Sequence, residues 1–80
     1  MKPGDLVRLK AGYPSATGVA VSWGRPGILH LLDVTRFEAG TPALLLQTDE
    51  VEFRKDHHSV AFILIDGRVG WVWPQELEPL

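Results

Sequence analysis

The sequence predicts a single all-β domain, and three observations lead to that prediction. Its 80 residues are enough for one domain and too few for two. Eight glycines and six prolines are spread along the chain, so they divide it into the short segments typical of antiparallel β proteins. Residues 43–61 are free of Gly and Pro, but their apolar positions cluster or alternate instead of recurring every three or four residues, as a helix requires.

Composition and charge exclude several classes of protein. The chain is 45% hydrophobic and 22% charged, which is a globular balance, and it has no cysteine for a disulfide scaffold. The formal net charge of −2 excludes a polybasic nucleic-acid tail. The polar start has no apolar region of a signal peptide, and no run reaches the 18 to 20 apolar residues of a membrane span. We therefore expect a soluble protein made in a cytoplasm.

Short apolar runs between turn residues predict the strands of the first two thirds of the chain. Strands are expected at residues 5–10, 18–22 and 28–37, with turns at 24–27 and 40–42. Two further strands are expected at 43–47 and 51–54, separated by a turn or bulge at Asp49-Glu50. Residues 55–58 contain a charged pair and two histidines, and we expect a polar loop there.

The strongest local signal is a β-hairpin near the C-terminus. Residues 59–65 and 68–73 are apolar runs joined by Asp66-Gly67, and Asp-Gly suits the two positive φ angles of a type I′ turn. A two-residue loop fixes the register. The expected pairs are Ile65 with Arg68, Leu64 with Val69, Ile63 with Gly70 and Phe62 with Trp71.

Both faces of this hairpin are mostly apolar, so a neighbouring loop or another subunit must cover the face that is turned away from the core. We expect the core to include the face with the larger aromatic side chains, together with the apolar residues of the other strands: Leu6, Val7, Leu9, Val19, Ile28, Leu32, Val34, Phe62, Leu64, Val69, Trp71 and Leu77. The opposite face and the leucine run after Gly40-Thr41-Pro42 are the candidate interaction residues, although the leucines also suit the core: Ala61, Ile63, Ile65, Val72, Leu44, Leu45 and Leu46.

The two ends of the chain carry a resemblance. Residues 66–80, with Asp66-Gly67, Trp73-Pro74 and Leu77-Glu78, resemble the end of a Src-homology-3-like (SH3-like) barrel, in which a distal hairpin precedes a 3₁₀ turn and a last short strand. The start at residues 3–9 is similar to the first strand of the same fold, and residues 11–22 correspond to its long first loop. The resemblance implies a small antiparallel barrel of five or six strands over residues 1–80.

More narrowly, the start and the finish together resemble small uncharacterised proteins of tailed bacteriophages. This resemblance implies a virion or accessory protein, located in the virion or in the cytoplasm of a host cell. The chain departs from the peptide-binding members of the SH3-like group, because it has neither their Ala-Leu-Tyr-Asp-Tyr opening nor their Trp-Trp pair. Recognition of polyproline is therefore not expected.

No set of residues points to catalysis, to a cofactor or to a metal. His57 and His58 are adjacent, so on a strand they face opposite sides, and His30 lies within an apolar run. No serine stands in a nucleophile motif. Asp49 and Glu50 are neighbours at a spacing that suits a solvated turn rather than a calcium loop. We expect no enzyme activity, no cofactor and no metal site.

These observations predict a non-catalytic structural or interaction module that docks on a protein partner or associates with itself. The first 36 residues carry five cations and two acids, a net charge of +3, and the remaining 44 carry three cations and eight acids, a net charge of −5. Opposite charges on the two halves suit packing of subunits. The alternatives are a nucleic-acid-binding or ribonucleoprotein-binding module, for which +3 is few cations, and a phage inhibitor or adaptor of a host protein.

Overall fold

The computed structural model describes residues 1–10, 18–23, 34–53 and 55–80. The prediction of an all-β protein is confirmed, because every regular element in these ranges except one turn of 3₁₀ helix is a strand. The elements are β1 (Leu6–Leu9), β2 (Val19–Ser22), β3 (Val34–Phe37), β4 (Pro42–Phe53), β5 (Asp56–Ile65), β6 (Arg68–Val72), η1 (Pro74–Glu76) and β7 (Leu77–Pro79).

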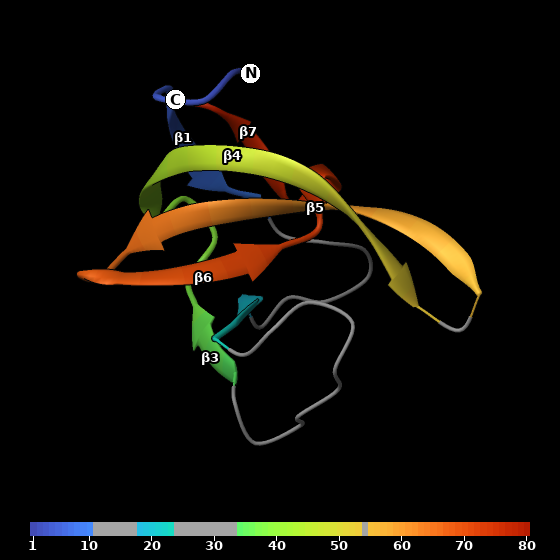
Figure 1. Cartoon of the computed structure of the whole chain (residues 1–80). Coiled ribbons are helices and arrows are strands. Elements are labelled where there is room, and N and C mark those ends of the chain that lie inside the picture. The colour runs from blue at the N-terminus through green and yellow to red at the C-terminus, as the bar shows by residue number, and fades with distance from the viewer. Residues whose placement is uncertain (11–17, 24–33, 54) are drawn as a thin grey trace.

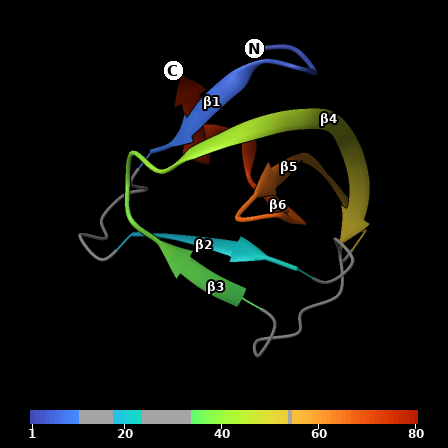
Figure 2. The same cartoon turned by 90° about the vertical axis from the view of Figure 1, so that its left-hand side faces the viewer.

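All seven strands belong to one antiparallel sheet with the order β3-β2-β6-β5-β4-β1-β7. The sheet is strongly curved, so that β1 and β4 lie across the interior from β2 and β3 (Figures 1 and 2). Within the described residues the sheet does not close, since β3 and β7 stand at its two ends. Seven strands are described where the SH3-like resemblance implies five or six, and β2 pairs with β3 at one end of the sheet.

The β5–β6 hairpin has the turn and the register that the sequence predicts. Asp66 and Gly67 both have positive φ, 52° and 73°, which suits the type I′ turn. The four expected pairs, from Ile65 with Arg68 to Phe62 with Trp71, are present. The 3₁₀ turn expected before the last strand is also present as η1, and β7 then pairs with β1.

The β4–β5 hairpin is longer than the sequence indicates. Pairing continues from Leu44 with Leu64 out to Phe53 with Asp56, so this hairpin projects beyond the other strands (Figure 1). The expected turn or bulge at Asp49-Glu50 is wrong, and the irregularity lies between Leu45 and Gln47. The expected polar loop at residues 55–58 is also wrong from Asp56 on, because cross-strand hydrogen bonds hold those polar residues in β5.

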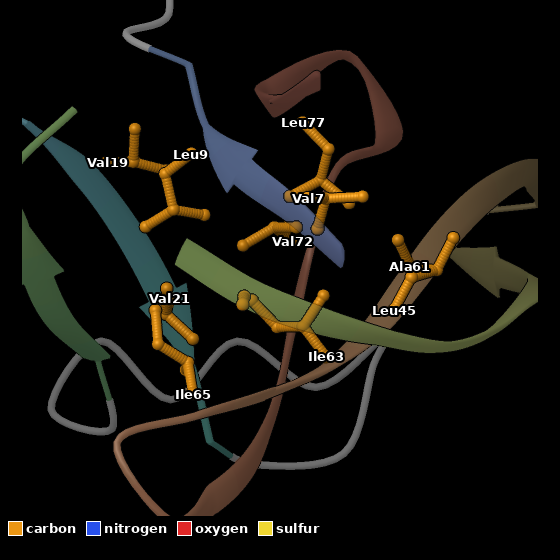
Figure 3. Close-up of a cluster of buried hydrophobic side chains, with 11 residues drawn as sticks. Val7, Leu9, Val19, Val21, Leu45, Ala61, Ile63, Ile65, Val72 and Leu77 are labelled. Atoms are coloured by element: carbon orange, nitrogen blue, oxygen red, sulfur yellow. The ribbon is translucent and has the colours of Figure 1, made fainter. Parts of the chain in front are cut away.

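The core lies on the concave side of the curved sheet (Figure 3). Val7, Leu9, Val19 and Leu77 are buried there as expected. The central hairpin contributes the face opposite to the expected one. The buried cluster is Val7, Leu9, Val19, Val21, Ala43, Leu45, Ala61, Ile63, Ile65, Val72 and Leu77, with Trp23 and Phe37 packed against it.

Four residues expected in the core are instead exposed on the outside of the sheet: Leu6, Val34, Leu64 and Val69. Trp71 is buried as expected, at 9% exposure, and Phe62 is half-buried. Ile28 and Leu32, which were also expected in the core, lie outside the described residues. The prediction therefore identified the hairpin correctly, but the main buried cluster takes the other face of it, and only Val60 and Trp71 of the expected face are buried.

Close packing around Gly70 explains which face is inside. A Cβ at this position would lie 2.6 Å from Val21 Cγ1 and 2.9 Å from the Trp23 ring, so only glycine lets β2 approach this closely. Trp23 also donates a 2.8 Å hydrogen bond from Nε1 to Thr35 Oγ1. The guanidinium of Arg68 stacks 4.1 Å above the Trp23 ring, which allows a charged residue on the inner face.

The η1 turn lies between β6 and β7 and contains Glu76, whose carboxylate is partly buried. The backbone N–H of Trp73 donates to Glu76 Oε1 at 3.2 Å, and Lys10 N–H donates to the Glu76 carbonyl at 2.8 Å. Desolvation by burial raises the pKa of the Glu76 carboxyl above its ordinary value of 4.5, although the hydrogen bond from Trp73 acts in the opposite direction.

Substitution of the two neighbouring hairpin residues should separate the inner from the outer face. Ile63 is 0% exposed, and we expect Ile63→Ala to lower the free energy of unfolding by about 2–5 kcal/mol through lost burial and a cavity. Leu64→Ala, at a residue that is 38% exposed, should cost clearly less. Urea denaturation followed by circular dichroism measures both, and a larger loss for Leu64→Ala would contradict the assignment of the faces.

The raised pKa of Glu76 should make stability fall as pH rises. The folded chain binds the proton more tightly than the unfolded chain, so ionisation of Glu76 opposes folding above about pH 4.5. Glu76→Gln keeps an acceptor for Trp73 and cannot ionise. We expect its unfolding free energy to exceed that of the wild type increasingly through this pH window. Glu78→Gln is the control, and an equal gain there would rule out the explanation.

Candidate docking surface

The outer face of the sheet carries a row of aliphatic side chains that crosses five strands. Cross-strand pairing aligns Leu6 of β1 with Leu44 of β4, Leu44 with Leu64 of β5, and Leu64 with Val69 of β6. Leu80 follows β7 and donates its backbone N–H to the Leu6 carbonyl, which places it at the other end. Because paired residues of antiparallel strands point to the same side, these five form one continuous line. We call it the outer row.

The outer row is the main apolar exposure of the described residues. Leu80 is 65% exposed, Leu6 60%, Val69 56% and Leu64 38%, whereas Leu44 at the centre is half-buried. Seven large hydrophobic residues are exposed in the described part of the chain, and four of them belong to this row. Scattered exposed hydrophobic residues are normal on a protein surface, whereas a contiguous line of them is less usual.

Aromatic side chains border the row on one side. Phe62 and Trp71 are cross-strand partners two positions along β5 and β6 from Leu64 and Val69. The ring of Trp71 meets that of Trp73 edge-to-face at 5.2 Å, and Trp73 meets the imidazole of His58 at 5.8 Å. These contacts fix the positions of the two tryptophan rings, so the outer row has ordered aromatic side chains along this edge.

An ion pair borders the row on the other side. Arg8 lies two residues from Leu6 on β1 and is paired with Glu78 of β7, with 2.8 Å between Arg8 Nε and Glu78 Oε1. Both side chains are partly exposed, so the pair contributes little to stability, of order 0–1 kcal/mol. Because the two side chains carry opposite charges, the pair adds no net charge to this edge of the outer row.

The structure separates the candidate interaction residues into two groups. Five of them lie in the core at 5% exposure or less, so they are not available to a partner of the folded chain: Ala61, Ile63, Ile65, Val72 and Leu45. Leu44 and Leu46 are half-buried. Leu44 is in the outer row, and Leu46 is at the β4 irregularity next to Gln47.

Sequence reasoning missed Leu6, Leu64, Val69 and Leu80 as surface residues. One signal in the sequence could have identified them. The inner face of the hairpin has the small residues Ala61 and Gly70, and small residues fit the tight interior of a curved sheet better than Phe62 and Trp71 do.

Two histidines and several acidic residues lie on the β4–β5 hairpin. Among the described residues, no group of three His, Asp or Glu side chains comes close enough to hold a metal ion. His57 is exposed opposite Glu52, and His58 is half-buried against Trp73, so the two histidines diverge as neighbours on a strand do. His30 lies outside the described residues.

Comparison with known proteins finds no matching family model, no matching curated protein and no matching solved structure. Within the described residues, no helix has the length and apolar character needed to cross a lipid bilayer.

Proposed function

We propose that this chain is a non-catalytic interaction module that docks on protein through the outer row. The observation that carries the proposal is the alignment of Leu6, Leu64, Val69 and Leu80 on one face while they remain exposed. Complete burial of an aliphatic side chain stabilises by about 1.5–3 kcal/mol, so a partner that covers several of them gains substantial free energy.

The form of the surface supports contact with protein rather than with nucleic acid. Binding to phosphates requires clustered cations, and the cation beside the outer row, Arg8, is paired with Glu78. An apolar centre with an aromatic margin and a polar rim is the composition typical of protein–protein interfaces. The residues of the row also belong to paired strands, so the surface is held rigid before a partner binds.

We further propose that the strands form an SH3-like barrel used as a scaffold. The Asp-Gly hairpin β5–β6, the turn η1 and the short β7 that pairs with β1 support this proposal. β2 lies within residues 11–22, which would then correspond to the long first loop. The resemblance of the two ends of the chain to tailed-phage proteins supports a virion or accessory role for the module.

Capture with matched variants tests the proposed function. Val69 of the outer row and Val34 of β3 are both exposed strand valines, at 56% and 43%, so Val69→Lys and Val34→Lys introduce the same charge at two places. We expect immobilised wild-type chain and Val34→Lys to retain the same protein from an extract of the native source. The Val69→Lys variant should retain at least ten-fold less of that protein than the wild type does, because a lysine at the contact must be desolvated.

Two outcomes would contradict the proposal. Equal retention by the Val69→Lys and Val34→Lys variants would show that the outer row is not the docking surface. Retention of RNA or DNA that nuclease treatment removes, with no protein retained, would instead favour a nucleic-acid-binding module.

A further inference from the structure

We infer that one edge of the projecting β4–β5 hairpin binds an extended segment of another protein that carries Lys or Arg at alternate positions. This edge is separate from the outer row, so the inference goes beyond the proposed docking function. β1 pairs with β4 only as far as Leu45, whereas β5 pairs with it out to Phe53. Among the described strands, none covers residues 47–53 of β4 on the side away from β5 (Figure 1). We call this side the β4 edge.

The register of the sheet shows which backbone groups lie along the β4 edge. The closing pair of a two-residue hairpin exchanges both backbone bonds, so Ile65 faces β6, and alternation along β5 turns Val60 toward its partner Asp49. Residues 48, 50 and 52 therefore turn their N–H and C=O groups away from β5. The N–H of Glu50 accordingly donates to the side chain of Asp49, with 2.8 Å to Oδ1. A row of outward backbone groups of this kind is a template for an additional strand.

The side chains along the β4 edge favour a cationic strand. Glu50 and Glu52 are two positions apart and both are exposed, so their carboxylates lie on one face. A shallow hollow beside Glu50 is lined by Thr48, Asp49, Glu50 and Ser59, so it presents two carboxylates and two hydroxyls. Lys or Arg at alternate positions of an added strand would stand opposite the two glutamates, and opposite charges paired across strands stabilise a sheet.

The hydrogen bond between Glu50 and Asp49 favours a cationic strand further. An added strand takes over the N–H of Glu50, and the Asp49 carboxylate then loses its donor. A Lys or Arg on the added strand gives this carboxylate a new partner, whereas an uncharged strand leaves it without one.

Charge disfavours a second copy of this chain as the occupant. Residues 47–59 contain four acids and two cations, a net charge of −2. Two β4 edges would place glutamates opposite glutamates, which destabilises strand pairing. The alternating cations of the chain itself, Arg8 and Lys10, stand in and directly after β1, which is already paired with β4 and β7. The occupant is therefore a segment of a different protein.

Backbone amide NMR of the whole chain, titrated with a peptide in which lysine and threonine alternate, tests the inference. We expect the peptide to shift the amide signals of Thr48, Glu50 and Glu52 and to slow the hydrogen exchange of Thr48 and Glu52. A peptide of the same composition with its lysines in one block should bind about three-fold more weakly or less, because only alternating lysines all lie on the face of the two glutamates.

Two proline variants distinguish the two edges of the hairpin. Thr48→Pro removes an N–H that points away from β5, so the pairing of β4 with β5 is kept, and the affinity for the alternating peptide should fall about five-fold or more. His57→Pro makes the same change on the opposite edge, in β5, and should bind like the wild type. Circular dichroism checks that both variants are folded. If Thr48→Pro does not fold, Glu50→Gln combined with Glu52→Gln should lower the affinity about three-fold or more.

The inference is overturned if the alternating peptide leaves the amide signals of residues 48–52 unchanged, if the block peptide binds equally well, or if His57→Pro weakens binding as much as Thr48→Pro does. The outer row provides a further control. Val69→Lys should bind the peptide like the wild type, and a loss of binding there would place the peptide on the outer row and contradict the inference. The proposed docking function does not depend on this result, since the protein captured through the outer row is tested separately.

Discussion

The close approach of β2 to β6 at Gly70 is the constraint on which the rest of the structure depends. Val21 and Trp23 occupy the space that a side chain at position 70 would need, so the face of the hairpin that contains Gly70 must be the inner one. Ile63 is paired with Gly70 and therefore also points inward, where it is completely buried. Alternation along the strands then sends Leu64 and Val69 outward.

The exposed apolar surface follows from this packing. A chain of 80 residues has a small core, and one buried face of the sheet already supplies the described cluster of aliphatic residues. On the second apolar face, Leu6, Val69 and Leu80 contribute little to the stability of the single chain, because they remain more than half exposed, whereas Val60 and Trp71 of the same face are buried. Aliphatic side chains that do not stabilise the monomer and would favour aggregation are explained if another surface covers them.

The sequence predicts local structure well here and non-local structure poorly. The Asp66-Gly67 turn and its register depend on neighbouring residues, and both are found as expected. The inner face of the hairpin depends on contact between Gly70 and Trp23, which are far apart in the chain. In the sequence, the charge of Arg68 suggests that this face is outward, since its stacking on Trp23 cannot be seen there.

The alignment of the outer row across the sheet was not predicted, for a similar reason. It takes one residue from each of four strands and Leu80 after β7, and its alignment requires the β1–β4, β4–β5 and β5–β6 registers. The irregularity between Leu45 and Gln47 changes the alternation within β4, so the leucine run at 44–46 cannot be divided between the two faces from the sequence.

Methyl NMR with a soluble paramagnetic agent tests the central claim most directly, because it reports the accessibility of each side chain. We expect the methyl signals of Leu6, Leu64 and Val69 to be strongly broadened, because these side chains are exposed. Those of Ile63 and Val72, which are buried, should be unaffected. Broadening of Ile63 and Val72 with protection of Leu64 and Val69 would contradict the account.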